Sequence, residues 1–410
     1  MLYDLIVIGG GAAGMMAAGR AAEKGARVLL LEKNNRLGVK LSITGKGRCN
    51  ITQAEFDNRK FIEELGANGK FLFSALHKFS ARDAMDFFES RGTELKIERG
   101  ARVFPKSDQS ENILEILVKY CRDNSVKILT RATVKEIIAK NKKIEKIILA
   151  DGQELLVEKY AICAGGKAYP GTGSSGEAYE WLAKMGHKII EPMPGLAPII
   201  MQEKWIKELE GASLKNVKIT VFQNNKKQDE RFGEALFTDD GMSGPIILDM
   251  SKKIGKLLKI GEVEISIDFK PALDFEVLDK RIQQDFMMFK NKMFKNGLDL
   301  LLPKKLIATF IKLSGIDENK KVNSITKQER KKLISLLKEF RLNVKKVDGF
   351  DKAIVTVGGA DLKEIDPKTM RSKIIANLYL AGEILDLDGP TGGFNLQIAW
   401  STGYALGDDF

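Results

Sequence analysis

The residues from Asp4 to Lys33 read DLIVIGGGAAGMMAAGRAAEKGARVLLLEK. The apolar run Asp4–Ile8 leads into three glycines, the alanine-rich stretch Ala12–Lys24 has helical character, and a second apolar run, Arg27–Leu31, ends at Glu32. A strand, a glycine turn, a helix and a second strand form a βαβ unit. The sequence therefore predicts an α/β domain of the Rossmann type.

The glycine turn matches a dinucleotide-binding pattern. Its glycines follow the spacing G-x-G-x-x-G, and Glu32 ends the next strand. The first glycine permits a tight turn, the second lets the backbone approach a pyrophosphate, and the third allows close packing of helix on strand. The helix N-terminus offers N–H donors to the phosphates, and the carboxylate accepts from the ribose hydroxyls. We predict a dinucleotide site, with an ordinary turn as the alternative, at Gly9, Gly11, Gly14 and Glu32.

The segment Leu31–Asn50, LEKNNRLGVKLSITGKGRCN, indicates which dinucleotide is bound. An NAD-binding domain needs no such segment, whereas small side chains, exposed backbone and added positive charge suit a flat ring and a pyrophosphate. The alternative is a surface loop. Cys49 is predicted to be a small packed residue instead of a nucleophile or a covalent flavin attachment, because no base stands near it. The residues concerned are Lys40, Thr44, Gly45, Lys46, Gly47, Arg48 and Asn50.

The composition is that of a soluble globular chain. It has 410 residues, 44% hydrophobic and 30% charged, and lacks an apolar run approaching the roughly 18 residues that span a bilayer. This length suggests two or three domains, and integral membrane association is not expected. The N-terminus begins with an acidic residue and a short strand instead of a signal-peptide pattern, so we expect a cytoplasmic location.

Cysteine and histidine are scarce. The three cysteines, Cys49, Cys121 and Cys163, show no C-x-x-C spacing, so neither a disulfide framework nor a metal site is expected. His77 and His187 are the two histidines, and both are predicted to be structural. If the chain is an enzyme, a cofactor is expected to supply most of its chemistry.

Short elements follow the first unit. Residues 94–166 predict strands, hairpins at Asn141-Lys142 and Asp151-Gly152, and a helix from about Ser107–Ser110. Prolines cluster near residues 191–195. The stretches Val217–Phe222 and Ile246–Asp249 predict strands, and a Lys-rich stretch from about residue 252 predicts amphipathic helices.

Five motifs resemble those of the bacterial YhiN-like flavoproteins. They are GGGAAG, KGRCN, AICAGGKAYPGTGSSGEAY at Ala161–Tyr179, LFTDDGMSGP at Leu236–Pro245 and YLAGEILDLDGPTGGFNLQIAWSTGYALG at Tyr379–Gly407. That family includes enzymes described as aminoacetone oxidases and bile-acid-type enone reductases. The resemblance implies a two-dinucleotide-binding-domain FAD fold interrupted by a β-barrel-like domain that carries a helical domain. The implied boundaries are 1–194 and 351–410 for the FAD-binding domain, 195–250 and 341–350 for the barrel, and 251–340 for the helices.

The resemblance also implies residues that surround a non-covalent FAD. The ADP half would lie against Gly9, Gly11, Ala13, Gly14, Glu32 and Lys33, and the adenine against the Val134 backbone. The ribityl chain and ring would lie along Lys40, Thr44, Gly45, Arg48, Cys49 and Asn50. A second turn at the phosphates would contain Ala164, Gly165 and Gly166. The flavin end would contain Gly382, Glu383, Gly393, Phe394, Asn395 and Gln397.

This chain departs from the family pattern at two places. Many members read SGGGRCN where this chain reads TGKGRCN, which leaves flavin binding intact. Several carry a histidine after the LFT run, where this chain has Asp239. A carboxylate at Asp239 is therefore the candidate catalytic acid or base.

A glycine turn precedes the C-terminal helix. Gly389–Asn395, which includes Gly392 and Gly393, feeds the helical stretch LQIAWSTGYALG. The amides of its N-terminus could face the N1–C2=O edge of a flavin and stabilise the negative charge of the reduced form. Glu383 could accept a ribityl hydroxyl. The alternatives are an ordinary terminal helix and a surface carboxylate.

A second G-x-G-x-x-G begins at Gly171. The spacer Gly165–Pro170 separates it from the strand that ends near Ala164, which breaks the strand-to-turn geometry of a separate NAD site. We predict a loop that borders the FAD.

The net charge of +11 comes mostly from residues 251–350, which contain 23 basic and 13 acidic residues. Dispersed lysines on helices are typical of solvated surface. We therefore predict an FAD-dependent oxidoreductase that transfers hydride through flavin N5, with NAD(P)H as a transient co-substrate and a small organic acceptor such as an enone. The alternatives are an amine oxidase that uses oxygen and a nucleic-acid-associated flavoprotein, although Phe286, Phe289, Phe294 and Phe310 are spaced for a helical core.

We predict that the protein purifies with tightly but non-covalently bound FAD, because the glycine turn and Glu32 provide an ADP grip and no strong attachment residue is present. Acid precipitation followed by chromatography of the supernatant measures this. Flavin retained in the pellet, or FMN in the supernatant, would contradict the prediction.

Overall fold

The computed structural model describes residues 2–410. They form two compact units: unit 1 contains residues up to Gly195 together with Phe350–Phe410, and unit 2 contains Leu196–Gly349. Each unit has a hydrophobic core of its own. The observed boundaries fall between residues 195 and 196 and between residues 349 and 350. The sequence predicted them one residue away, at 194/195 and 350/351.

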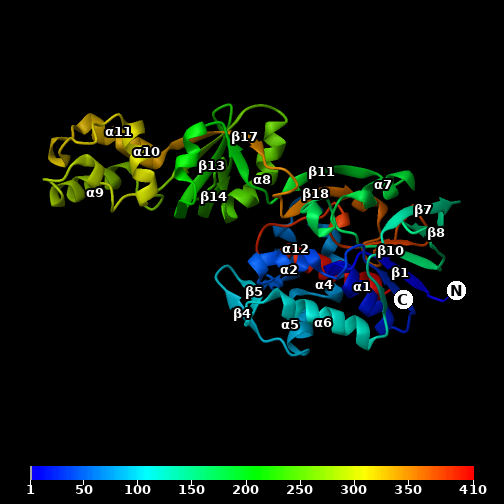
Figure 1. Cartoon of the computed structure of the whole chain (residues 1–410). Helices are drawn as coiled ribbons and strands as arrows, with labels where there is room; N and C mark the ends of the chain where they lie inside the picture. The colour runs from blue at the N-terminus through cyan, green and yellow to red at the C-terminus, as the bar shows by residue number, and fades with distance from the viewer. Residues whose placement is uncertain (1) are drawn as a thin grey trace. The chain divides into compact units, whose positions relative to one another are not determined.

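Unit 1 is built on a parallel five-stranded sheet with the order β19-β10-β1-β2-β6. Figure 1 labels two of its strands, β1 and β10. The strands pair in register, with Ile6 opposite Tyr160 on one side and Leu29 on the other. Every residue of β1 is buried, as expected for a central strand of a parallel sheet. The strands are β1 (Leu5–Ile8), β2 (Val28–Leu31), β6 (Lys127–Leu129), β10 (Lys159–Ile162) and β19 (Leu378–Leu380).

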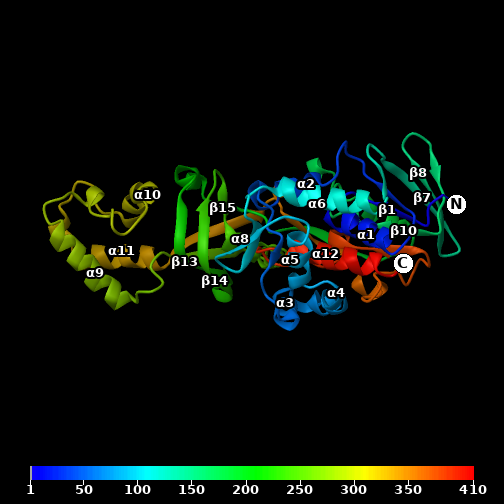
Figure 2. The ribbon, with the colours of Figure 1, turned by 90° about the horizontal axis from the view of Figure 1, so that it is seen from below.

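Two helices from opposite ends of the chain, α1 (Ala12–Glu23) and α12 (Phe394–Gly407), lie side by side (Figure 2). Glycines on α12 allow this close approach. A Cβ added to Gly403 would lie 2.4 Å from the carbonyl oxygen of Ala13, and one added to Gly407 would lie 2.6 Å from that of Ala17. The C-terminal helix is therefore packed directly on the first βαβ unit.

Three small antiparallel sheets and six further helices complete the main elements of unit 1 as described. The Asn141-Lys142 turn between β7 and β8 has positive φ angles at both residues, which confirms the predicted hairpin. The predicted helix near Ser107–Ser110 is α6. The sheets are β3 (Thr52–Gln53) with β5 (Arg102–Pro105) and β4 (Leu95–Glu98); β7 (Val134–Lys140) with β8 (Lys143–Leu149) and β9 (Glu154–Leu155); and β11 (Ile189–Gly195) with β18 (Val355–Ala360). The helices are α2 (Val39–Gly47), α3 (Asn58–Glu64), α4 (Phe73–Lys78), α5 (Ala81–Glu89), α6 (Ser110–Asp123) and α7 (Glu177–Lys184).

Unit 2 contains a closed six-stranded barrel, to which a group of helices is joined (Figure 1). In order around the barrel the strands are β12 (Ile199–Met201), β15 (Gly241–Ser243), β14 (Lys226–Phe237), β13 (Ser213–Gln223), β16 (Val263–Asp268) and β17 (Phe340–Val347). The helices are α8 (Pro245–Leu258), α9 (Phe275–Met288), α10 (Lys304–Ser314) and α11 (Lys327–Lys338). The predicted strand Val217–Phe222 lies within β13. The predicted fold class, a Rossmann-type domain with barrel and helical insertions, is confirmed.

The predicted strand Ile246–Asp249 is wrong, because these residues lie in α8. Pro245 occupies the first turn of the helix, where its missing N–H is tolerated, and Gly244 before it has a φ of +97°. Ile247, Met250 and Ile254 are then buried at helical spacing. The stretch 251–340 also differs from a purely helical domain, because β16 returns to the barrel.

None of the helices in residues 2–410 is both long enough and apolar enough to cross a membrane.

The close approach of α12 to α1 predicts that Gly403→Ala lowers the stability of unit 1. The added methyl group would meet backbone at 2.4 Å, and overpacking of this kind costs about 1–3 kcal/mol. Thermal unfolding followed by circular dichroism measures the change. Gly171→Ala is the matched control in the same unit, because a Cβ there meets no atom within 4 Å. Equal melting temperatures for the two variants would contradict the prediction.

Candidate functional site

The carboxyl ends of the parallel strands bring the predicted site residues to one edge of the sheet. Gly9 follows β1, Glu32 follows β2, Ala164 closely follows β10, and Gly382 closely follows β19. The strand order reverses direction between β1 and β10. In open α/β sheets, ligands bind in the crevice outside the carboxyl ends of the strands at such a switch point.

The glycine turn after β1 has the shape that its sequence predicts. Gly9 has a φ of +106°, and a Cβ there would lie 2.5 Å from the carbonyl oxygen of Cys163. A Cβ on Gly14 would lie 1.8 Å from the carbonyl oxygen of Gly9, whereas one on Gly11 would meet no atom within 4 Å. The turn is therefore packed tightly on the protein side and open at Gly11, where a pyrophosphate would approach.

The N-terminus of α1 is suited to an anion. Gly11 is its N-cap, no side chain caps the helix, and its first turn contains no acidic residue. Unpaired backbone N–H groups and the positive end of the helix dipole at this point favour phosphate. The uncapped helix and the open glycine fit the pyrophosphate of FAD, and Ala12 and Ala13 would contribute through their backbone.

Glu32 connects the ends of two strands. Its carboxylate accepts hydrogen bonds from the N–H groups of Gly10, at 2.8 Å, and Asn34, at 2.7 Å, and the residue is only 8% exposed. The sequence assigned this carboxylate to the ribose hydroxyls, a role that stays a prediction and that its remaining lone pairs permit. Its support of the glycine turn was not foreseen.

The loop that contains the second G-x-G-x-x-G borders the end of β2. Lys33 donates from Nζ to Ser175 Oγ at 2.8 Å and pairs with Glu177 at 3.0 Å. Asn34 donates from Nδ2 to the carbonyl oxygen of Thr172. The strand that follows this loop, β11, pairs antiparallel with β18 and does not join the parallel sheet, so the loop does not open a second Rossmann unit.

The segment that follows β2 folds as α2 and then leaves helical geometry. Gly45 and Lys46 have left-handed backbone angles, with φ values of +57° and +61°, and Gly47 and Cys49 follow with +82° and +59°. The Thr44 hydroxyl donates to the carbonyl oxygen of Leu41. Gly45 and Gly47 were predicted to expose backbone toward a ring. In the structure they form a turn with positive φ angles, which glycine adopts readily.

Lys40 and Glu383 bind one another. Lys40 Nζ lies 2.7 Å from Glu383 Oε2, and both side chains are partly buried. Glu383 Oε1 accepts from the N–H of Thr356 at 2.8 Å, and the Thr356 hydroxyl accepts from the N–H groups of Lys167 and Ala168. This network joins four segments of the chain. Thr356 was not identified from the sequence.

The turn after β10 is packed against the same network. Gly165 has a φ of +76°, and a Cβ on Gly166 would lie 2.3 Å from Thr356 Oγ1. Gly382 has a φ of +80°, and its N–H donates to Thr402 Oγ1. Side chains larger than hydrogen are therefore excluded at Gly166 by contact and disfavoured at Gly165 and Gly382 by backbone angle.

Arg48 is held by two carboxylates and an aromatic ring, and its place beside a flavin stays a prediction. Its guanidinium pairs with Glu98 and with Asp108, the latter at 2.7 Å, and lies 4.0 Å from the ring centre of Phe104. These carboxylates raise the pKa of Arg48 above its ordinary value. Its charge is committed to the region around β4 and β5.

Cys49 is fully buried, and burial raises its pKa to about 12. It is therefore a thiol at neutral pH, as expected for a packed residue and not for an activated nucleophile. Cys121 and Cys163 are also buried and free. No cluster of three metal-ligating side chains occurs in the part of the chain that the structure describes.

The N-terminus of α12 resembles that of α1. Gly392 and Gly393 have φ values of +121° and +104°, and no side chain caps the helix. A Cβ on Gly393 would lie 2.3 Å from the carbonyl carbon of Thr52. The helix start is thus pressed against β3 with its backbone N–H groups uncapped. Phe394 is buried, with its ring 4.8 Å from that of Phe61.

Asn395 and Gln397 use their side chains within the protein. The Asn395 amide exchanges hydrogen bonds with the backbone of Gly389. Gln397 is fully buried, accepts from the Thr52 hydroxyl and donates to the carbonyl oxygen of Phe79. The side chains of both residues therefore stabilise the position of α12. A contact of either residue with a flavin would then come from its backbone.

Two side-chain oxygen atoms in the segment that contains β3 have no hydrogen-bond partner. Asn50 Oδ1 and Gln53 Oε1 are buried and form no hydrogen bond. A Cβ on Gly392 would lie 3.5 Å from Gln53 Oε1. Asn50 was expected from the sequence to lie along the ring, whereas Gln53 was not identified from the sequence.

The other predicted residues lie as follows. Val134 begins β7 and is buried, and its contact with adenine stays a prediction. Asp239 is exposed, in the turn between β14 and β15 of unit 2, and its catalytic role also stays a prediction. His187 lies between Glu364 and Ser372, and burial lowers its pKa. His77 is exposed on α4.

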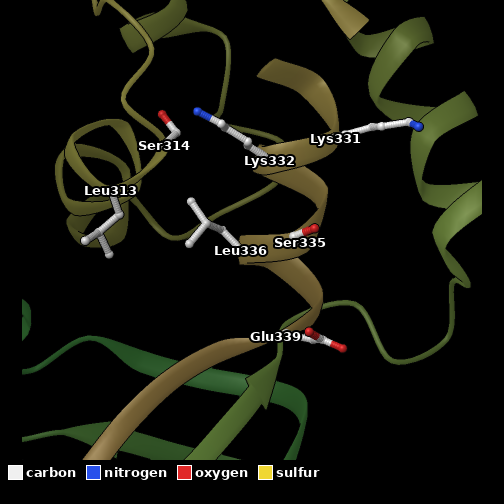
Figure 3. Close-up of a pocket in the computed structure, with 7 residues that line it drawn as sticks. All are labelled: Leu313, Ser314, Lys331, Lys332, Ser335, Leu336 and Glu339. Atoms are coloured by element: carbon white, nitrogen blue, oxygen red, sulfur yellow. The ribbon is translucent and has the colours of Figure 1, made fainter. Parts of the chain in front are cut away.

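A surface pocket of about 460 Å³ lies in unit 2, at α10 and α11. Figure 3 shows Lys332 reaching toward Ser314 across this space, while Lys331 points away. It is lined by Leu313, Ser314, Lys331, Lys332, Ser335, Leu336 and Glu339. None of the predicted cofactor residues contributes to it.

Comparison with known proteins gives full-length matches. The family model described as HI0933-like protein Rossmann domain matches residues 3–409. A 3-dehydro-bile acid delta(4,6)-reductase of Clostridium scindens is 32% identical, over 98% of this chain and 97% of that protein. A ribosomal RNA dihydrouridine synthase of Escherichia coli is 30% identical, over 99% and 98%.

Among solved structures, a 3-ketosteroid-delta4-(5alpha)-dehydrogenase from Rhodococcus jostii aligns with a TM-score of 0.52 at 13% identity, over 99% of this chain and 96% of that one. A flavocytochrome c3 fumarate reductase aligns with a TM-score of 0.53 at 14% identity, over 99% and 78%. At these identities the likeness concerns the fold.

We predict that Glu32→Ala weakens FAD binding by about 1.5–3 kcal/mol, the range for a hydrogen bond to a charged group. Because the carboxylate also accepts from Gly10 and Asn34, the melting temperature of the apoprotein should fall as well. Fluorescence titration of apoprotein with FAD measures the first effect. Glu32→Gln, which keeps one carbonyl acceptor, is the control and should lose less. Unchanged FAD affinity in Glu32→Ala would assign the carboxylate to the turn alone.

Proposed function

The chain belongs to the HI0933-like family of Rossmann-domain proteins and is an FAD-dependent oxidoreductase; on that basis we propose that it reduces an electron-poor carbon–carbon double bond conjugated to a carbonyl group. NADH or NADPH is the proposed electron donor, binding transiently over the flavin. This donor is consistent with the predicted cytoplasmic location. A small organic enone is the proposed acceptor.

The observation that carries this proposal is the chemistry shared by two full-length relatives. One is named as a reductase of a 3-dehydro-bile acid, and the other as a synthase of dihydrouridine in ribosomal RNA. In both products a double bond conjugated to a carbonyl has become saturated. This common reaction class favours a reductase over the amine oxidase alternative.

The residues of unit 1 are suited to holding the cofactor. The uncapped N-terminus of α1 and the open Gly11 would bind the pyrophosphate, and Glu32 would accept from the ribose while it holds the glycine turn. Bound FAD supplies hydride chemistry through its N5. The pairing of Lys40 with Glu383 fixes the two segments proposed to flank the ribityl chain.

The N-terminus of α12 would orient the ring. Its uncapped amides carry the positive end of the helix dipole, which favours a partly negative edge such as N1–C2=O. The side chains of Asn395 and Gln397 keep these amides in place. Asp239 is proposed as the group that donates a proton to the acceptor.

A second candidate acceptor is a uridine in structured RNA. The Escherichia coli relative named above and a Haemophilus influenzae relative, 30% identical over 98% of this chain and 96% of that protein, are both named ribosomal RNA dihydrouridine synthases. Residues 251–350 carry a net charge of +10, which suits phosphate. Phe286, Phe294 and Phe310 are buried, whereas Phe289 is half-buried and Phe275 is exposed, so RNA contacts in this region would depend mainly on lysines.

Anaerobic stopped-flow mixing with NADPH and NADH tests the proposal. We expect one of them to bleach the flavin on the timescale of turnover, and a conjugated enone to restore the yellow colour without oxygen. Failure of both nucleotides, together with reduction by a small amine and rapid recovery in oxygen, would replace the reductase by an oxidase.

A ribosomal RNA transcript in place of the enone separates the two acceptors. RNA recognition would give faster flavin reoxidation that weakens steeply between about 50 and 200 mM salt, with a smaller slope when lysines of residues 251–350 are neutralised. A small-molecule reductase would be insensitive to the transcript.

A further inference from the structure

The last turn of α9 exposes apolar side chains. Leu278, Ile282 and Phe286 are buried on one face of this helix, whereas Met287 is 74% exposed and Met288 is 66% exposed. Successive residues of a helix are about 100° apart around its axis, so the chain turns away from the buried face after Phe286. A single exposed apolar residue needs no explanation, but adjacent ones mark an interaction site.

Lysines accompany these methionines. The stretch Phe286–Leu298 reads FMMFKNKMFKNGL and contains three lysines and no acidic residue. Lys290 and Lys292 are exposed, and Lys292 Nζ lies 4.1 Å from the ring centre of Phe289. Met293, which follows, is 44% exposed. The exposed residues of this stretch form what we call the Met–Lys surface, which consists of Met287, Met288, Lys290, Lys292 and Met293.

The surroundings of the Met–Lys surface within unit 2 add to its positive charge. Figures 1 and 2 both draw α9 as the helix of its group farthest from the barrel strands β13 and β14. Lys321 pairs with Met293 in an antiparallel bridge and is another exposed cation. Asp285 is buried, 3.8 Å from Arg281, and the backbone of Glu318 lies beyond Met293. The exposed charge next to the methionines is therefore mainly positive.

A surface that is both apolar and cationic fits an anionic membrane. Lipid head groups offer phosphates to lysines, and the acyl chains that begin beneath them receive apolar side chains. Methionine suits such an interface because its unbranched side chain adapts to irregular apolar surroundings. RNA would supply phosphates for the lysines but would leave the methionines in water, because proteins that bind single strands stack the bases on aromatic side chains.

We propose that the Met–Lys surface docks this protein on an anionic lipid membrane, with Met287 and Met288 inserted at the head-group boundary and Lys290 and Lys292 against the lipid phosphates. Docking of this kind is peripheral and reversible. It differs from a membrane span, for which no helix among residues 2–410 is long and apolar enough. The docking requires neither FAD nor an acceptor, so it stands independently of the proposed function.

Sedimentation of the purified protein with phosphatidylcholine vesicles, with and without phosphatidylglycerol, tests the proposal. We expect binding to the vesicles that contain the anionic lipid, weaker binding at high salt and little binding to neutral vesicles. Met287→Ser combined with Met288→Ser should lower the partition coefficient at least about tenfold, and Lys290→Gln combined with Lys292→Gln should lower it by a similar factor. Leu156→Ser, at a 54% exposed position between β9 and β10 of unit 1, is the matched control and should leave it unchanged.

Insertion of the methionines has a readout of its own. In Met288→Trp, lipids brominated near the head group should quench tryptophan fluorescence more strongly than they do in the unsubstituted protein. Absence of vesicle binding, equal binding to neutral and anionic vesicles, or binding that the methionine substitutions leave unchanged overturns the proposal. If vesicles do not bind and the methionine substitutions instead abolish self-association or binding of an RNA transcript, the Met–Lys surface belongs to that partner and the proposal is likewise overturned.

Discussion

The hydrogen bond from the N–H of Gly10 to the carboxylate of Glu32 connects the ends of β1 and β2. Both strands are buried on both faces, so their positions are set by the core, whereas the turn between β1 and α1 has left-handed backbone at Gly9 and needs a specific support. Glu32 provides it at the point where the chain leaves β2. This contact holds the turn that leads into the uncapped N-terminus of α1, and α12 packs against the helix itself.

The rest of the site is assembled by the return of the chain after unit 2. β19 joins the sheet beside β10, and α12 packs on α1 through Gly403 and Gly407. This return brings Gly382 and the Gly392–Gly393 turn to segments near the N-terminus. Every predicted cofactor-binding residue lies in unit 1, so unit 2 is an insertion that the assembly of this edge does not require.

The sequence predicted the parts of the structure that follow from local pattern. Apolar runs and glycine spacing located β1, α1 and β2, and the Gly165–Pro170 spacer argued correctly against a second Rossmann unit. These patterns can be recognised in sequence because a strand, a glycine turn or a helix cap is determined by a few consecutive residues. The error at Ile246–Asp249 arose from a short apolar run, which periodicity alone cannot assign, and the signal that decides it is Pro245 at the first turn of a helix.

Partner choice could not be predicted in the same way. Nothing near Arg48 in sequence indicates that Glu98 and Asp108 will neutralise it, and nothing near Gln397 indicates Thr52 and Phe79. These pairs are separated by 50 to 345 residues and exist only after the sheets and α12 have packed. The residue types therefore indicated where in the chain a binding site lies. Only the folded structure shows which polar atoms already have a partner within the protein.

Three of the four cations predicted to surround the cofactor, Lys33, Lys40 and Arg48, each pair with a carboxylate. These pairs are partly exposed, and pairs of that kind add little stability in water, but they cancel the charge that a phosphate would otherwise meet. Besides Lys46, the pyrophosphate would meet backbone, namely the N–H groups at the start of α1 beside the open space at Gly11. Backbone donors cannot move or titrate. A site of this kind would recognise shape and hydrogen-bond pattern more than net charge, in keeping with the glycines of the turn between β1 and α1.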